Sequence, residues 1–366
     1  MDFYSTLQCL GWLAVGLMMF MFAVTGGFDL GAGMLVPFIG KTDAERRVVI
    51  NTVGPTWDGN QVWLVIAGGV IFAIFPRVYA ASFSGFYFGI LLVLWALFLR
   101  PVAFEFRSKI ETQCWRNFWD WALCVGSFIP ALVIGVAIGN LFLGVPFQVD
   151  PITLRFMYGA NPNDPSAFID LLMLLRPFAL LVGVVCVLMM LMHGSAYLVM
   201  RTSGVILARA KTVLTVSAIL LMLSFLAAGI WLMITMPQWL VNYNNHWWLW
   251  FAPLLAFLGA IGAVRFSQKN HVVKAFSFSC VSVLGILGTM GYALFPYIMI
   301  SSTHPEQSLV VWNSTSSELS LIGILVCAVI ILPVIFYYTH FVYRKMWGRD
   351  VKMSVEKIEQ ENHVLY

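Results

Sequence analysis

The chain has 366 residues, of which 60% are hydrophobic and only 10% are charged. So few charges could not cover the surface of a water-soluble protein of this length, and the composition therefore predicts a polytopic, all-α membrane protein. The small net charge of +4 gives no sign of a nucleic-acid partner. Residues 1–8 contain no Lys or Arg, unlike a cleaved signal peptide, so we expect the first apolar segment to be retained.

Nine apolar segments are long enough to cross a bilayer as helices. They lie near Leu10–Phe38, Val53–Phe75, Val78–Leu99, Phe118–Gly144, Pro177–Met200, Thr212–Met236, Trp247–Val264, Val273–Ile300 and Ser320–Tyr343.

The connections between these segments carry Lys and Arg very unevenly. Connections on one side, together with the C-terminal tail, hold 18 of the 21 basic residues, and the other side holds only Arg77, Arg155 and Arg176. Basic residues stay on the cytoplasmic side of a membrane. The pattern predicts an outside N-terminus and a cytoplasmic C-terminus.

The long connection Val145–Arg176 is rich in Pro and Asn, so we expect turns there and no long helix. It separates a predicted four-helix bundle at residues 1–145 from a second at residues 146–310. A ninth helix and a tail follow at residues 311–366. Glycines four apart, at residues 27–31 and 135–139, predict close helix packing. The inner stretch Phe104–Trp121 mixes charges with aromatic residues and predicts a short amphipathic stretch that lies on the membrane surface.

Polar residues open the second membrane segment, in V-G-P-T-W-D-G-N-Q-V-W at residues 53–63. A carboxylate at the centre of a bilayer costs about 2.5–3.5 kcal/mol, so Asp58 needs water or a partner. Asp58 and Gln61 are three residues apart and would share one helix face. One interpretation is a helix end whose polar residues face lipid headgroups. The other is a hydrated pocket through which protons pass.

The predicted topology places Asp29, Asp58 and Arg100 at similar depth on the cytoplasmic side, although they come from three consecutive helices. This agreement favours the pocket, because the guanidinium would lower the cost of holding both acids ionised. Arg100 on its own would be an ordinary residue that extends from a helix end toward the interface.

Redox metals in a membrane need axial ligands on facing helices. His193 lies deepest of the histidines in a predicted membrane segment, since His340 is near the inner end of the ninth, and we expect His193 to face headgroups near a helix end. The six cysteines are scattered singly, and no metal-binding or nucleotide-binding motif occurs. We therefore predict no metal site and no catalytic residue in this chain.

Several motifs together resemble one known family, subunit II of cytochrome bd-type quinol oxidases, and the resemblance runs from end to end. The motifs are G-F-D-L-G at 27–31, W-D-G-N-Q-V-W-L at 57–64, F-S-G-F-Y at 83–87, F-L-R-P-V-A-F-E-F-R-S-K at 98–109, R-N-F-W-D-W at 116–121, G-N-L-F-L-G-V-P-F at 139–147, F-P-Y-I-M-I-S-S-T at 295–303, W-N-S-T-S-S-E-L at 312–319 and K-M-W-G-R at 345–349.

The resemblance implies a haem-free core subunit of a terminal oxidase in the bacterial cytoplasmic membrane. It would stabilise a haem-bearing subunit I, which would hold two haems b and a haem d, or a further haem b in place of haem d. That complex oxidises quinol and reduces dioxygen to water with protons from the cytoplasm. Small single-helix subunits, membrane lipid and a structural quinone in this chain are further expected partners.

The same resemblance implies roles for particular residues. Asp58, Asp29 and Gln61 would belong to the cytoplasmic proton route, with Arg100 as electrostatic partner. Trp57 and Trp63 would line an inter-subunit region suited to oxygen access. Gly26 departs from the family, in which an acid commonly precedes G-F-D, so this chain would depend more on Asp29.

Two alternatives remain open. The acids could serve a self-sufficient proton-coupled transporter, but such proteins often show repeated halves, and the fifth to eighth segments have no interior Asp or Glu to match Asp29 or Asp58. A pure scaffold is compatible with everything except the placement of the acids.

Overall fold

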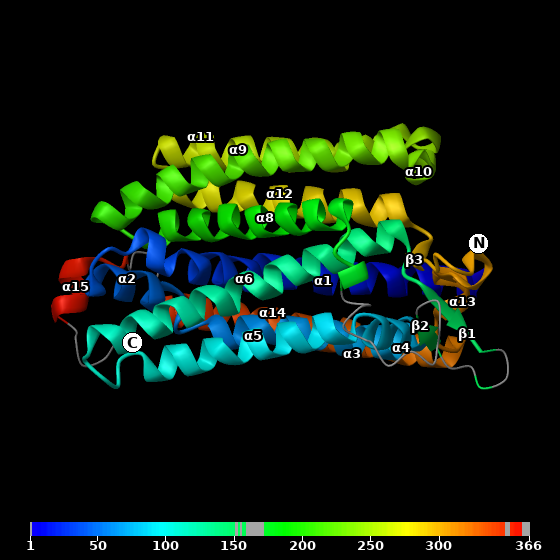
Figure 1. Cartoon of the computed structure of the whole chain (residues 1–366), viewed down its shortest axis with the longest axis horizontal. Helices are drawn as coiled ribbons and strands as arrows, with labels where there is room; N and C mark the ends of the chain where they lie inside the picture. Colours follow the sequence, from blue (N-terminus) through cyan, green and yellow to red (C-terminus); the bar gives the residue numbers. More distant parts are fainter. Residues whose placement is uncertain (1, 151–152, 154–155, 159–171, 348–351, 361–366) are drawn as a thin grey trace.

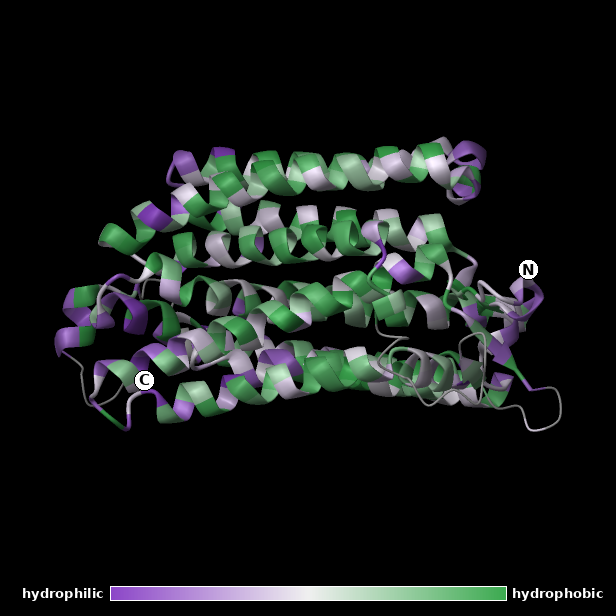
Figure 2. Cartoon of the chain, viewed as in Figure 1, coloured by the Kyte–Doolittle hydropathy of each residue, from purple (hydrophilic) through white to green (hydrophobic). Residues whose placement is uncertain are grey.

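The computed structural model describes residues 2–150, 153, 156–158, 172–347 and 352–360. Long helices lie side by side along one direction, and the short elements gather at the two ends (Figure 1). Figure 2 shows that hydrophobic residues dominate the middle of the long helices and that hydrophilic residues gather at their ends. This distribution is the one that a bilayer requires.

Within the described residues, nine helices are long and apolar enough to span a membrane, which confirms the predicted count. They are α1 (Phe3–Ile39), α3 (Trp57–Ile74), α5 (Tyr87–Phe106), α6 (Gln113–Leu143), α8 (Pro177–Arg201), α9 (Gly204–Thr235), η2 with α11 (Trp247–Trp250 and Phe251–Gln268), α12 (Val272–Leu294) and α14 (Glu318–Trp347). The division into two bundles remains a prediction, because α1 contacts α3 and α6 before residue 145 and also α8 after it.

The two ends of the molecule differ. One end carries α2 (Asp43–Val53) and α15 (Val355–Gln360), and we call it the basic end. The other, which we call the strand end, carries short elements: α4 (Pro76–Gly85), β1 (Phe147–Val149), β2 (Phe156–Tyr158), η1 (Pro237–Leu240), α10 (Val241–Asn245), β3 (Tyr297–Met299), η3 (Pro305–Gln307), β4 (Leu309–Val310) and α13 (Val311–Ser314). The orientation of these ends in the membrane remains a prediction from the basic residues.

Two small antiparallel hairpins cover the strand end. β1 pairs with β2, with Phe147 opposite Tyr158, and β3 pairs with β4. The backbone of Val145 bonds to Ile300 and Ser302, at 2.8 and 3.0 Å, and so joins the two connections that contain the hairpins. The sequence predicted turns in the first connection but gave no sign of the β1–β2 hairpin. Residues 159–171 of that connection lie outside the described part.

Three predicted segments need correction. The segment Val53–Phe75 is broken, because α2 ends at Val53 and α3 starts at Trp57, after the Gly54-Pro55 pair. The segment Val78–Leu99 is divided at Phe86 into α4 and α5. The stretch Phe104–Trp121 is no surface helix, since α5 continues to Phe106 and α6 begins at Gln113.

A network of ion pairs explains why α5 and α6 extend so far at the basic end. Asp120 on α6 is fully buried and accepts from Arg46 at 2.8 Å and from Arg107 at 2.5 Å. Arg107 also reaches Asp43 at 2.8 Å, and Asp43 binds Arg116 at the same distance. Buried carboxylates are tolerated when charged hydrogen bonds satisfy them. The network thus ties α2 to the ends of α5 and α6.

A capping box begins α2. Thr42 and Glu45 satisfy each other's backbone N–H groups, as this motif requires. Burial alone would raise the pKa of the Glu45 carboxyl, but hydrogen bonds from Arg209 and from the backbone of Lys41 and Thr42 outweigh it and lower that pKa. The Arg209 bond, at 2.7 Å, also fastens α2 to α9.

A close helix crossing joins α1 to α8. A Cβ atom added to Gly31 would lie 1.9 Å from the Met190 carbonyl oxygen, and one added to Gly194 would lie 2.5 Å from the Gly31 backbone. Only glycine on both helices allows this approach. The crossing holds α1, and with it Asp29, against the centre of the molecule.

We predict that Gly31→Ala destabilises the protein by about 1–3 kcal/mol or more, because the new methyl group meets backbone that cannot turn aside. Thermal unfolding of the purified protein in detergent measures this. Gly16→Ala on the same helix is the control, since a Cβ there meets nothing within 4 Å. Equal unfolding temperatures for both variants would contradict the account.

Candidate functional site

A cluster of polar side chains lies inside the membrane-spanning part of the molecule, around Asp29 of α1. Asp29 follows Gly26, Gly27 and Phe28, and its side chain is fully buried. Its Oδ2 atom accepts a hydrogen bond of 2.7 Å from Nδ2 of Asn60, at the start of α3. Its Oδ1 atom has no hydrogen-bond partner in the protein.

Arg100 of α5 supplies positive charge to this cluster. The residue is 0% exposed and interacts electrostatically with Asp29. None of its three guanidinium nitrogens has a hydrogen-bond partner in the protein, so the ion pair is not a direct fork-to-fork contact. A buried guanidinium keeps its charge only with a counter-ion or an acceptor. Its donors therefore remain available to water or to another acceptor beside Asp29.

Asn60 and Tyr343 complete the cluster, and the sequence interpretation missed both. The Tyr343 hydroxyl of α14 donates to Oδ1 of Asn60 at 2.6 Å. Asn60 lies in the W-D-G-N-Q motif, but in that motif the formal charge of Asp58 is the stronger signal of a functional residue. Tyr343 is 283 residues from Asn60, and no local pattern could pair them.

Asp58 does not join this cluster. A helix turns about 100° per residue, so a residue two positions from Asn60 faces nearly the opposite direction. With Asn60 directed at Asp29, Asp58 lies on an exposed side of α3. The structure thus brings Asp29 and Arg100 together, as expected, and leaves Asp58 on the surface of this chain.

The other predicted residues surround the start of α3. Gln61 is half-buried, and its Nε2 atom is enclosed without a partner. Trp57 stacks on Phe104 with ring centres 5.1 Å apart. Trp63 is 2% exposed and lies against Phe336 of α14. Trp63 therefore packs within this chain, whereas Trp57 is only half-buried, and a role for either in oxygen access remains a prediction.

Gly26, where the resemblance implied an acid in relatives, is closely covered by an aromatic ring. A Cβ atom at Gly26 would lie 2.7 Å from the ring of Phe22, one turn earlier in α1. Phe22 itself is 5% exposed. An acid at position 26 would displace this ring, so Asp29 is the one carboxylate that this part of α1 presents to the cluster.

His193 is buried among helices, so the expectation that it faces headgroups is wrong. Its Nε2 atom lies 2.8 Å from the Val24 carbonyl, and Nδ1 lies 2.8 Å from the Ser279 hydroxyl. The ring stacks on Phe276 with centres 5.0 Å apart. The α1–α8 crossing draws this part of α8 inward. With both nitrogens engaged, His193 offers no lone pair to a metal.

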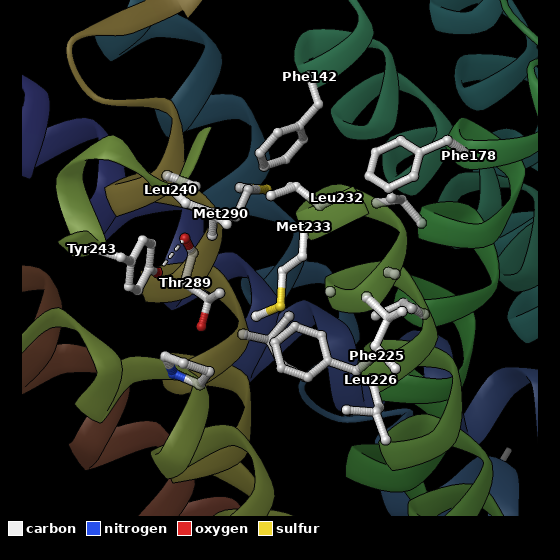
Figure 3. Close-up of a pocket in the computed structure, with 18 of the residues that line it drawn as sticks. Phe142, Phe178, Phe225, Leu226, Leu232, Met233, Leu240, Tyr243, Thr289 and Met290 are labelled. Carbon is white, nitrogen blue, oxygen red and sulfur yellow. Dashed lines mark hydrogen bonds between the residues drawn. The ribbon is translucent and has the colours of Figure 1, made fainter. Parts of the chain in front are cut away.

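A separate cavity of about 280 Å³ lies toward the strand end, among α6, α8, α9, α10, α11 and α12. Phe142, Phe178, Phe225 and Met233 contribute to its apolar wall (Figure 3). Among its polar groups, the Tyr243 hydroxyl is already engaged, since it donates to the Thr289 carbonyl at 2.8 Å. The cavity suits a hydrocarbon chain better than a charged ligand. Within the described residues, no group of three or more His, Cys, Asp or Glu side chains could hold a metal ion.

Comparison with known proteins gives consistent results. Residues 7–346 match the family model for cytochrome bd terminal oxidase subunit II. The chain is 44% identical to cytochrome bd-I ubiquinol oxidase subunit 2 of Escherichia coli (strain K12), over 99% of both chains. It is 32% identical to cytochrome bd ubiquinol oxidase subunit 2 of Bacillus subtilis (strain 168), over 96% of this chain and 99% of that one.

The fold is similar to that of a chain in the bd oxidase from Geobacillus thermodenitrificans. The TM-score is 0.73, and the match covers 93% of this chain and 98% of that one. At 17% identity this likeness concerns the fold alone.

Proposed function

Because this chain belongs to the cytochrome bd terminal oxidase subunit II family, we propose that it is the haem-free core subunit of its quinol oxidase and carries part of the cytoplasmic proton route. The complex lies in the bacterial inner membrane, pairs this chain with a subunit I, and couples quinol oxidation to oxygen reduction. The family membership leaves no support for the self-sufficient transporter.

The exposed side of α3 supports docking of subunit I there. Asp58, Val62, Val65, Gly69 and Phe72 are all exposed. Their spacing of four, three, four and three residues follows one helix face, as in a helix–helix seam. A Cβ atom at Gly69 would meet nothing within 4 Å, so a partner helix could approach closely.

The carboxylate of Asp58 indicates whether lipid or protein packs against this face of α3. A carboxylate directed at acyl chains is costly, whereas one that faces a protein partner or trapped water is tolerated. The neighbouring α14 also leaves most of its apolar surface exposed. We therefore assign subunit I, rather than lipid, to this side of the chain.

The proton route follows from the two acids of the first two membrane helices. Asp58 would take up protons at the inter-subunit face, near the basic end that the Lys and Arg distribution assigns to the cytoplasm. Asp29, held by Asn60 and beside Arg100, would provide a second carboxylate inside this chain. The observation that carries this proposal is the complete burial of Asp29 and Arg100 without a direct hydrogen bond between them.

The haems are assigned to subunit I: two haems b, with a haem d or a further haem b. The membrane-buried His193 does not fit an axial ligand, since both of its nitrogens are hydrogen-bonded. A structural quinone fits better. The apolar cavity beside α9 would hold its isoprenoid chain, which needs bulk and hydrocarbon contacts rather than hydrogen bonds.

We predict that Asp29→Asn and Asp58→Asn each lower quinol-dependent oxygen consumption about tenfold or more, as expected when a proton-transfer group is lost. The rate is measured per haem in the purified complex, so that altered assembly is counted separately. Glu111→Gln, an exposed acid outside the cluster, is the control. Full turnover in both Asp variants would refute the proton route.

We expect His193→Gln to leave the reduced-minus-oxidised haem spectrum of the complex unchanged, because this chain ligates no haem. Loss of an absorption band, with normal amounts of both subunits, would show that the histidine does bind one.

We also predict that Gly229→Phe lowers the quinone content of the purified complex by about one molecule, because the new ring would enter the cavity. Gly229 lines the cavity, and a Cβ there meets nothing within 4 Å. Mass spectrometry of extracted lipid measures the content, and Gly16→Phe, equally open but away from the cavity, is the control. Unchanged quinone with displaced phospholipid would instead identify an acyl-chain site.

A further inference from the structure

The last membrane helix contributes one polar group to the buried cluster. Tyr343 is half-buried on α14, and its hydroxyl donates to Oδ1 of Asn60 at 2.6 Å. The Nδ2 atom of the same amide donates to Asp29 at 2.7 Å. The three side chains therefore form one hydrogen-bonded series from α14 through α3 to α1.

The direction of these bonds matters because the two ends of an amide differ. One end accepts hydrogen bonds and the other donates them. While the phenol donates to Oδ1 of Asn60, the NH₂ group must face Asp29, where it favours the charged carboxylate. If the amide turned over, its oxygen would face Asp29 and favour the protonated acid instead.

Tyr343 also interacts electrostatically with Tyr197 of α8. Beyond α14, the chain returns to the basic end, where Met353 bonds to the Arg201 carbonyl at 2.8 Å and to the Ser203 N–H at 3.2 Å. Met353 is 2% exposed.

We propose that Tyr343 is a positioning residue for Asp29 and acts through Asn60, whose amide it holds with the donor end toward the carboxylate. The inference rests on the proposed role of Asp29 in the proton route. Within the described residues, Arg100 from α5, Tyr197 from α8 and Tyr343 from α14 interact electrostatically with Asp29. His193 of α8 packs against the same part of α1, and α3 contributes the Asn60 amide.

The test is Tyr343→Phe in the purified complex, which keeps the ring and removes the hydroxyl. We expect the limb of the pH–rate profile that Asp29→Asn alters to move to higher pH by about 0.5–1 unit, the size of one net hydrogen bond. We expect the haem spectrum and the KM for quinol to stay unchanged, because a residue that positions Asp29 acts on proton transfer and not on the binding of haem or quinol. Tyr337→Phe is the matched control, since Tyr337 lies on the same helix and is 74% exposed.

A double variant tests the path through the amide. Asn60→Leu removes both ends of the amide, so adding Tyr343→Phe to it should cause no further shift. Additive shifts of the pH–rate profile in the double variant would overturn the inference. So would an unchanged profile in Tyr343→Phe, if Asp29→Asn does alter the profile. If Asp29→Asn leaves the profile unchanged, the proposed function fails, whatever Tyr343→Phe does.

Discussion

The rest of the structure depends on how one carboxylate and one guanidinium are kept inside the membrane-spanning part of a single chain. Asp29 and Arg100 are both fully buried and attract each other without a direct hydrogen bond. A charge at the bilayer centre costs about 2.5–3.5 kcal/mol on insertion scales, and nothing in helix packing alone repays that. The proton transfer to a partner subunit that we propose would need charge at this depth.

Helix packing sets the geometry of this pair. The glycines at the α1–α8 crossing bring α1 to the centre, and the Gly54-Pro55 break lets α3 start beside Asp29 with its own orientation. At the basic end, Asp120 holds Arg46 and Arg107, and so fastens α2 to the last turns of α5 and α6. Arg100, two turns earlier in α5, is positioned by this attachment. The position of the site thus depends on the close backbone contact at the α1–α8 crossing and on the ion pairs at the basic end.

The sequence predicted the nine membrane helices because length and hydrophobicity alone decide which segments cross a bilayer. It also predicted that Asp29 and Arg100 meet, since topology fixes depth. It could not predict which way α3 faces. Both sides of a membrane helix are apolar, so periodicity does not separate the side of Asn60 from that of Asp58. The pairing of Tyr343 with Asn60 depends on tertiary structure, and the breaks before α3 and α5 depend on local backbone that a hydrophobic run conceals.

The most direct test is a cryo-EM structure of the assembled oxidase at a resolution that shows ordered water. The account predicts that the Asp58 carboxylate lies against subunit I and that water connects it with Arg100 and the free oxygen of Asp29. Acyl chains packed on Asp58, or a dry apolar layer between it and Arg100, would contradict the account.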